Sequence, residues 1–349
     1  MHVGPVVTGQ VGRKARLNGP LVVLVGPTAT GKSRLGVLLA KALMAAGQPA
    51  SIVSADSRLV YRELTIGTAK PTPDEQQGIP HAMIDCVPPD AVFSAAQYAH
   101  QAYGVLCELW QQQILPIIVG GTGFYLQALL QGHNDALPPV SPNPTYRNAL
   151  QTEIEQSGLQ TLYLRLQAQD PQRAVEIYPT DAFRIIRALE IIEFSGQKAS
   201  SFKAPALEVP KNQLWFGLGI DDRTLLHARI ALRTQAMFSA GWLKEVEGLL
   251  ARYGPQAPAL QATLGYPELV AHLQNPGAQP LSEVQEKIVI LTRQYARRQL
   301  TWFKRNPAIL WTPVDPWLAP ALPEPERARL DAAWLDAAMA RIRETPGML

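Results

Sequence analysis

The chain has 349 residues, more than one ordinary domain needs, which predicts a core with an inserted or appended part. Its hydrophobic content of 47% is ample for a buried core, and no run of eighteen apolar residues suggests a membrane-spanning helix. A net charge of +3 does not by itself indicate nucleic acid, so that argument depends on where the charges lie. Cys86 and Cys107 lack metal-ligand spacing and suit a reducing compartment. Because no apolar secretion segment begins the sequence, we expect a cytoplasmic protein that does not bind membranes.

The first predicted strand follows a mildly basic tail, residues 1–18, which we expect to be flexible. The apolar run Leu21–Val25 leads into the sequence GPTATGKS, residues 26–33, and then into an alanine- and leucine-rich helical stretch. This strand, loop and helix order is typical of a phosphate-binding P-loop. Glycines let backbone amides turn toward an anion, Lys32 neutralises phosphate oxygens, and the Ser33 hydroxyl can ligate Mg²⁺. The loop alone does not say whose phosphates are held.

Two further buried strands are predicted before residue 132, in the runs ASIVSAD and ILPIIVGGTG, with segments long enough for crossover helices between them. This alternation favours an α/β fold, a P-loop NTPase-like core whose parallel sheet is flanked by helices. Ligands bind beyond the carboxyl ends of such strands. Asp56 and Ser57 follow the second strand and Thr122 follows the third, so a carboxylate and a hydroxyl should converge on the phosphate cradle.

The proline-rich sequence ALPPVSPNP marks a boundary, and residues 145–200 then show helical periodicity with one weak strand candidate, TLYLRL. We interpret this part as a helical insertion domain. The run LWFGLGI predicts a return to the sheet, and helices are predicted to about residue 306. The predicted organisation is a discontinuous catalytic core over residues 19–140 and 213–317, a helical insertion over 141–212, and a C-terminal helix within 318–349.

The C-terminal helix has apolar residues near helical spacing, namely Leu330, Trp334, Ala338 and Ile342. We expect this face to dock on the protein's own core. A second helical stretch, TRQYARRQLTWFKR at 292–305, holds five basic residues and no acid. Helical geometry places Ile288, Leu291, Tyr295 and Trp302 on one side and Arg293, Arg297 and Lys304 on the other. The second face is either a solvated charged surface or a site for a polyanion such as RNA.

The position of Asp56 leaves two kinds of chemistry open. The carboxylate can hold Mg²⁺ through water, as in P-loop kinases and ATPases, or it can take a proton from an incoming nucleophile. In the second case the cradled phosphates are a leaving group.

Five motifs, in order along the chain, resemble those of a known family. The resemblance favours the second kind of chemistry, in which the phosphates are a leaving group. GPTATGKS, ADSRLVYRELTIGTAKP, IIVGGTGFY, RIIRALEI and LTRQYARRQLTWFKR, from about Val22 to Asn306, together resemble the tRNA dimethylallyltransferase (IPP transferase) family. The family transfers a dimethylallyl group from dimethylallyl diphosphate to N6 of adenosine 37, in tRNAs that read codons beginning with U.

The resemblance implies that the P-loop holds the donor's diphosphate together with Mg²⁺, for which Ser33 is the expected ligand and which is the only cofactor implied. It also implies that Asp56 is the general base and that Thr122 and Lys32 lie at the reaction centre. The implied diphosphate-binding residues are Gly26, Pro27, Thr28, Ala29, Thr30, Gly31, Lys32, Ser33, Arg229 and Arg233.

The expected macromolecular partner is the tRNA anticodon arm, bound by a monomer, with the target base extruded from its stack. The residues that the resemblance places against tRNA are Asp56, Ser57, Arg58, Leu59, Thr122, Arg147, Phe183, Arg184, Arg187, Gly265, Tyr266, Arg297, Arg298, Gln299, Thr301, Trp302 and Lys304.

Two positions depart from the family pattern. Thr65 stands where relatives commonly have Asp, and Pro267 stands where they have Lys. Three alternative functions remain: an adenylate isopentenyltransferase that makes cytokinin nucleotides, a P-loop nucleoside kinase or ATPase, and a noncatalytic RNA-binding protein. The basic helix and the insertion favour RNA over an AMP-sized acceptor, and the run IIVGG ends in glycine at the place where a kinase would have a Walker-B carboxylate.

Overall fold

The computed structural model describes residues 19–130, 140, 143–202, 210, 212–319 and 322–349. The predicted flexible tail, 1–18, lies outside these residues. The chain divides into two compact units, one formed by residues 1–131 and 208–349 and the other by 132–207. Within the described part, no helix is both long and apolar enough to cross a membrane.

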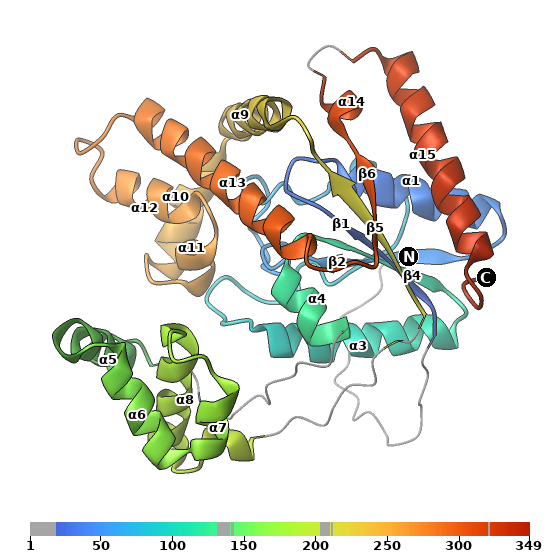
Figure 1. Cartoon of the computed structure of the whole chain (residues 1–349). Coiled ribbons are helices and arrows are strands. Elements are labelled where there is room, and N and C mark those ends of the chain that lie inside the picture. Colours follow the sequence, from blue (N-terminus) through green and yellow to red (C-terminus); the bar gives the residue numbers. More distant parts are fainter. Residues whose placement is uncertain (1–18, 131–139, 141–142, 203–209, 211, 320–321) are drawn as a thin grey trace. The chain divides into compact units, whose positions relative to one another are not determined.

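The first unit is built on a six-stranded parallel sheet with the strand order β3-β2-β4-β1-β5-β6 (Figure 1). The strands are β1 (Leu21–Val25), β2 (Ala50–Ala55), β3 (His81–Ala82), β4 (Leu115–Gly120), β5 (Gln213–Gly219) and β6 (Ile309–Pro313). β1, β2 and β4 are buried at every position, as continuous apolar runs in a doubly covered parallel sheet should be. The predicted fold class and the return at LWFGLGI are confirmed, whereas β3 and β6 were not predicted.

The register of the sheet brings three strand ends together. Val25 pairs with Gly120, and Gly120 pairs with Ala55. Since the strands are parallel, the residues that follow them, including Gly26 and Asp56, leave the sheet at the same edge.

Helices cover both faces of the sheet. α1 (Lys32–Ala45) and α15 (Glu324–Glu344) pack against one another on one face, whereas α3 (Ala95–Gln111) and α4 (Gly123–Leu130) pack together on the other (Figure 1). The short helices α2 (Pro73–Gln76) and α14 (Asp315–Leu318) lie in the connections.

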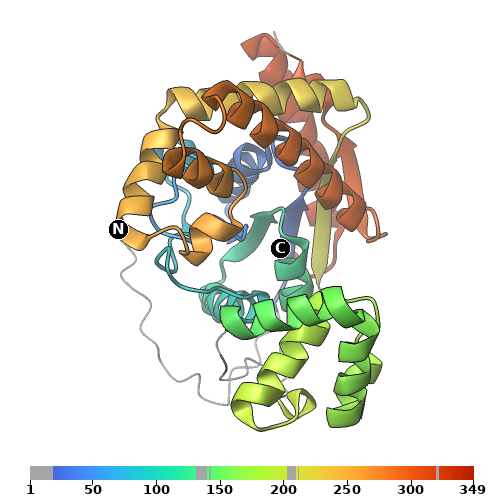
Figure 2. The same ribbon diagram turned by 90° about the vertical axis from the view of Figure 1, so that its left-hand side faces the viewer.

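Five more helices complete the first unit: α9 (Arg223–Ser239), α10 (Trp242–Tyr253), α11 (Pro258–Ala262), α12 (Tyr266–Gln274) and α13 (Leu281–Phe303). Figure 2 shows α9 and α13 running side by side, and α12 contacts α10, α11 and α13.

The second unit is helical and has its own core. It contains α5 (Pro144–Ser157), α6 (Leu159–Gln169), α7 (Pro171–Glu176), α8 (Ala182–Ser195) and a short 3₁₀ turn, Ala199–Ser201. The strand candidate TLYLRL was wrong, because it lies within α6. Leu162 and Leu166, one helical turn apart, are fully buried, whereas Leu164 is 54% exposed, so the apparent alternation does not reflect a buried strand face.

The C-terminal helix α15 docks on the core of the first unit, as its apolar spacing predicted. Trp334, Ala338 and Ile342 are buried in one cluster with residues of β1 and α1. Asp331 adds polar anchoring, because it pairs with Arg34 of α1 and accepts a hydrogen bond from Trp317 Nε1 at 2.8 Å. Residues 318–349 are therefore part of the first unit's packing.

Replacing Trp334 with alanine is expected to lower the free energy of unfolding by about 3–5 kcal/mol, because a large buried side chain leaves a cavity. Urea denaturation followed by circular dichroism measures this change. Leu232→Ala, at a position 55% exposed on α9, is the control and should change stability little. Equal effects of the two substitutions would contradict the docked position of α15.

Candidate functional site

The P-loop joins the end of β1 to the start of α1 and is held by its own polar groups. Gly26 has φ 151°, and a Cβ there would meet the Leu218 carbonyl oxygen at 2.8 Å, so a side chain does not fit. Thr30 Oγ1 and Lys32 Nζ donate hydrogen bonds to the Pro27 carbonyl at 2.8 and 2.6 Å. The amides at the start of α1 point out of the helix, which makes this end suited to an anion.

Two partly buried cations, Lys32 and Arg233, face this cradle. Burial lowers the pKa of the Lys32 ammonium to about 7, an effect partly opposed by the charge of Asp56 and increased by that of Arg233. Burial also lowers the pKa of the Arg233 guanidinium, again against the attraction of Asp56. A bound anion would supply the negative charge that both groups lack.

Asp56 and Thr122 lie at the ends of the neighbouring strands β2 and β4. Asp56 Oδ1 accepts a hydrogen bond from the Arg58 amide at 2.8 Å, and Thr122 Oγ1 accepts one from the Ser57 amide at 3.0 Å. Thr122 also donates its amide to the Ala55 carbonyl at 3.1 Å. Tyr295 lies close to both side chains, and burial, reinforced by the charge of Asp56, raises its pKa to about 12. The phenol is therefore neutral at physiological pH.

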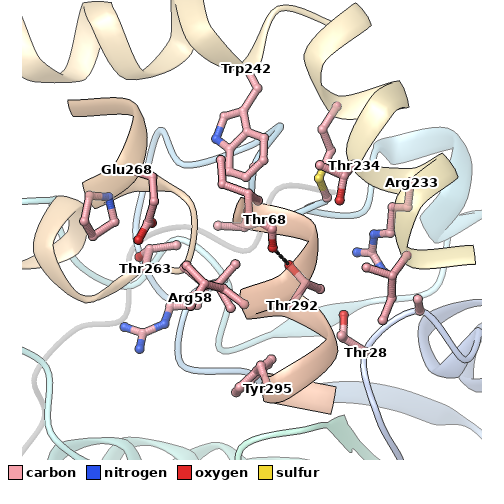
Figure 3. Close-up of a pocket in the computed structure, with 18 of the residues that line it drawn as sticks. Thr28, Arg58, Thr68, Arg233, Thr234, Trp242, Thr263, Glu268, Thr292 and Tyr295 are labelled. Carbon is pink, nitrogen blue, oxygen red and sulfur yellow. Dashed lines mark hydrogen bonds between the residues drawn. The ribbon is translucent and has the colours of Figure 1, made fainter. Parts of the chain in front are cut away.

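A pocket of about 450 Å³ opens between these strand ends and the helices α9 to α13 (Figure 3). Its polar side includes Thr28, Asp56, Arg58 and Arg233. The side formed by α9 to α13 carries apolar surface among polar groups such as Thr263, Glu268 and Thr292. Its apolar residues are Ile230, Met237, Trp242, Ala262, Leu264, Pro267, Ile288 and Leu291. The pocket thus suits a ligand with a charged end and a hydrocarbon end.

Glu245 of α10 holds a loop at this pocket and was not predicted. Its carboxylate accepts the amides of Thr65, Ile66 and Gly67 at 2.9, 2.6 and 3.2 Å, and the Tyr266 hydroxyl at 2.7 Å. Gly67 lines the pocket. Glu245 binds the loop through its backbone amides. The Thr65 side chain is exposed and takes no part in this anchoring.

Comparison of the sequence with known proteins identifies the family of this chain. The model described as IPP transferase matches residues 59–306. The chain belongs to the IPP transferase family. A relative from Synechococcus sp. named tRNA dimethylallyltransferase is 42% identical over 303 residues, which cover 86% of this chain and 93% of the relative.

Two solved structures of IPP transferases resemble this chain in sequence and in fold. The full-length tRNA isopentenylpyrophosphate transferase from Bacillus halodurans is 33% identical with a TM-score of 0.60, over 91% of this chain and 97% of that one. The tRNA Δ(2)-isopentenylpyrophosphate transferase from Staphylococcus epidermidis is 32% identical with a TM-score of 0.62, over 93% and 99%. As a member of this family, the chain is a transferase.

The structure brings much of the predicted reaction centre together. Thr28, Ala29, Asp56, Arg58 and Arg233 line one pocket. The other P-loop residues and Thr122 are not among the residues that line it, and Thr122 Oγ1 accepts the Ser57 amide next to Asp56. Arg229 is exposed on the outer side of α9, where its charged neighbours are Arg34 and Arg327. Pro267 also lines the pocket, at the start of α12.

Three of the residues expected against tRNA lie inside the protein. Leu59 is 9% exposed, Gln299 is 6% exposed and Tyr266 is fully buried, with its hydroxyl donated to Glu245. Gly265, the N-cap of α12, has φ 89°, and a Cβ there would meet the Trp242 ring at 2.3 Å. The side chains at these positions are therefore used in packing and anchoring, which sequence spacing did not reveal.

α13 presents an exposed cationic face beside the site. The side chains of Arg297, Arg298, Thr301 and Lys304 are exposed, and no acidic partner pairs with these three cations in the described part of the chain. Arg293, predicted on the same face, is only partly exposed, and its Nε is buried without a partner. Trp302 is half-buried against Phe124 of α4, with ring centroids 4.5 Å apart.

The predicted residues of the second unit form a charge network of their own. Arg147 and Arg187 both pair with Glu190, which is fully buried, and Glu190 also accepts the Asn143 amide at 2.6 Å. Arg184 pairs with Asp181 at 3.0 Å, and the Phe183 ring is 71% exposed with the Arg147 guanidinium 5.9 Å from its centroid. Much of the positive charge expected to face RNA here is thus balanced inside the unit.

Proposed function

We propose that the chain transfers a dimethylallyl group from dimethylallyl diphosphate to N6 of adenosine 37 in tRNAs that read codons beginning with U. The observation that carries this proposal is the meeting of the phosphate cradle with Asp56 at one edge of the sheet, beside a pocket with an apolar side. A P-loop alone suits any phosphorylated ligand. The relative named tRNA dimethylallyltransferase supports the choice of donor and acceptor.

On the donor side, the loop amides, Lys32 and Arg233 hold the diphosphate. As the bond between C1 of the prenyl group and the diphosphate oxygen breaks, negative charge grows on that oxygen, and these cations offset it. The apolar wall, including Ile230, Met237 and Leu291, suits the branched hydrocarbon of the donor.

On the acceptor side, C1 bonds to N6 of the extruded adenine, and the N6 proton passes to the Asp56 carboxylate. Oδ1 already accepts the Arg58 amide, and in the described part of the chain no hydrogen bond engages Oδ2, which is therefore the oxygen that takes the proton. An exocyclic amine is a poor nucleophile, so holding N6 in line with C1 contributes as much as removing the proton. Thr122 borders this acceptor position.

Magnesium fits the donor set that the P-loop offers. Among the described residues, no group of three His, Cys, Asp or Glu side chains forms a protein-only metal site. Mg²⁺ commonly binds to substrate phosphates, water and only one or two protein oxygens, and the exposed Ser33 hydroxyl at the start of α1 supplies one. When bound, the ion neutralises charge on the diphosphate.

The test is transfer of radiolabelled prenyl from dimethylallyl diphosphate, with Mg²⁺, to unmodified tRNA that reads codons beginning with U, with AMP as a parallel acceptor. Label at adenosine 37 of tRNA alone supports the proposal. Label in AMP would instead indicate an adenylate isopentenyltransferase, and ATP turnover without prenyl transfer would indicate a kinase or ATPase.

Replacing Arg297 with alanine is expected to weaken tRNA binding and to reduce the slope of log affinity against log salt by about one, because one phosphate contact is lost. Filter binding at several salt concentrations measures the slope. Arg329→Ala removes the same charge from a side chain that is 79% exposed on α15 and serves as the control. Identical slopes for the two variants would leave the α13 face as an ordinary solvated surface.

A further inference from the structure

Gln299 of α13 lies where the donor side and the acceptor side of the proposed site meet. Its Oε1 accepts a hydrogen bond from the Thr28 amide of the P-loop at 2.8 Å. Its Nε2 donates to the Gly121 carbonyl at 2.9 Å. One buried amide therefore joins the phosphate cradle to the residue immediately before Thr122.

The loop that carries Thr122 packs directly against α13 beside Gln299. A Cβ at Gly121 would lie 2.1 Å from Gln299 Nε2, and a Cβ at Gly123 would lie 2.2 Å from Trp302 Nε1. A side chain at either position would force Gln299 or Trp302 to move, so the two glycines that flank Thr122 allow the loop to approach the helix as closely as it does. Gln299 and Trp302, three residues apart, share the helix face that receives it.

We infer that Gln299 is a positioning residue, which fixes the separation between the diphosphate cradle and the loop that carries Thr122. The inference rests on the proposed prenyl transfer. In that reaction C1 and N6 must be held close and in line, and small displacements of either side lower the rate strongly. Gln299 itself touches neither reacting atom, so it acts through the two loops.

The chemistry of an amide explains why glutamine suits this position. The Thr28 amide needs an acceptor and the Gly121 carbonyl needs a donor, and a neutral amide supplies both. A carboxylate would accept from Thr28 but would leave the buried Gly121 carbonyl facing another oxygen, and it would place a negative charge beside the diphosphate. A hydrocarbon side chain would satisfy neither group, which costs free energy in a buried site.

Gln299 differs from its neighbours in sequence in the exposure of its side chain. Arg297 and Arg298 are exposed, whereas Gln299 is 6% exposed with both ends of its amide engaged. A role in direct RNA contact and a role in positioning therefore make different predictions for the same substitution.

The experiment compares Gln299→Met, which keeps the side chain's length but removes both hydrogen bonds, with Gln294→Met at an exposed position of the same helix. For Gln299→Met we expect turnover at saturating donor and tRNA to fall by about 100-fold, with the directly measured tRNA affinity unchanged. Gln294→Met should resemble the wild type. A weaker tRNA affinity with normal saturated turnover would overturn the inference and indicate an RNA contact.

Hydrogen exchange provides a readout that does not depend on activity. In Gln299→Met the amides of residues 26–33 should exchange faster than in the wild type, while peptides from α15 should be unaffected. Unchanged exchange in the P-loop would overturn the inference even if turnover fell. Failure of the wild type to transfer a prenyl group would refute the proposed function instead, and the exchange result would still decide whether Gln299 ties the two loops.

A double-mutant cycle tests whether Gln299 acts through the loop of Thr122. If it does, the turnover losses of Gln299→Met and Thr122→Val will be less than multiplicative when combined, because the two substitutions disturb the same unit. Multiplicative losses would mean that the residues act independently, which would overturn the proposed positioning role.

Discussion

Replacing Asp56 with asparagine is expected to lower turnover by about two to four orders of magnitude while tRNA binding persists. The amide oxygen can still accept the Arg58 amide hydrogen bond, so the turn that follows β2 should be kept. An asparagine cannot take the N6 proton, however. Single-turnover transfer from labelled dimethylallyl diphosphate, with enzyme in excess, measures the chemical step apart from binding.

The control for this substitution is Asp90→Asn, which removes the same charge from an exposed carboxylate of the first unit. It should leave the rate of transfer close to that of the wild type. Near-normal turnover in Asp56→Asn would remove its assignment as general base. A loss of tRNA affinity as large as the loss of turnover would assign Asp56 to base binding and not to proton transfer.

The strand ends that form the reaction centre were predictable because their signals are local. A buried strand followed by a glycine-rich loop and a helix identifies the P-loop, and parallel strands necessarily share one ligand-binding edge. Asp56 and Thr122 could therefore be placed beside the cradle because each directly follows a predicted strand. The observed pairing of β1, β4 and β2 confirms that reasoning.

Short and edge elements were less predictable. β3 has two residues and β6 ends in Pro313, so neither has the long apolar run that identified the central strands. In the helical unit, TLYLRL alternates by chance, and only the tertiary burial of Leu162 and Leu166 shows that it is helical. Periodicity over six residues does not separate these possibilities.

The polar contacts that organise the site depend on long-range packing, which no local pattern encodes. Gln299 is separated from Thr28 by 271 residues and Glu245 from Thr65 by 180, and each satisfies backbone groups that the sequence does not mark as unpaired. The run of cations around Gln299 suggested an RNA contact for it. Its amide instead faces inward, because α13 buries that side against the P-loop and the Thr122 loop.

Replacing Lys32 with methionine is expected to weaken binding of pyrophosphate and to lower turnover by about 100- to 1,000-fold, because a charge aimed at the leaving group is lost. Calorimetric titration with pyrophosphate at constant Mg²⁺ measures the binding. Lys41→Met, at an exposed lysine of the same helix whose Nζ contacts Gln77, is the matched control and should bind normally. Equal binding by the two variants would remove Lys32 from the cradle.

Because of the pKa of Lys32, the affinity for pyrophosphate is expected to depend on pH. In the free protein burial lowers this pKa to about 7, and a bound diphosphate favours the ammonium and so raises it. At pH values between the pKa of Lys32 in the free protein and its pKa in the complex, Lys32 takes up a proton when the ligand binds. The affinity should therefore fall by about tenfold for each pH unit above 7. Lys32→Arg stays charged, so dividing the wild-type dissociation constant by that of Lys32→Arg removes the titration of pyrophosphate itself. This ratio should rise from pH 7 to pH 9, and a constant ratio would show that Lys32 is already charged throughout in the free protein.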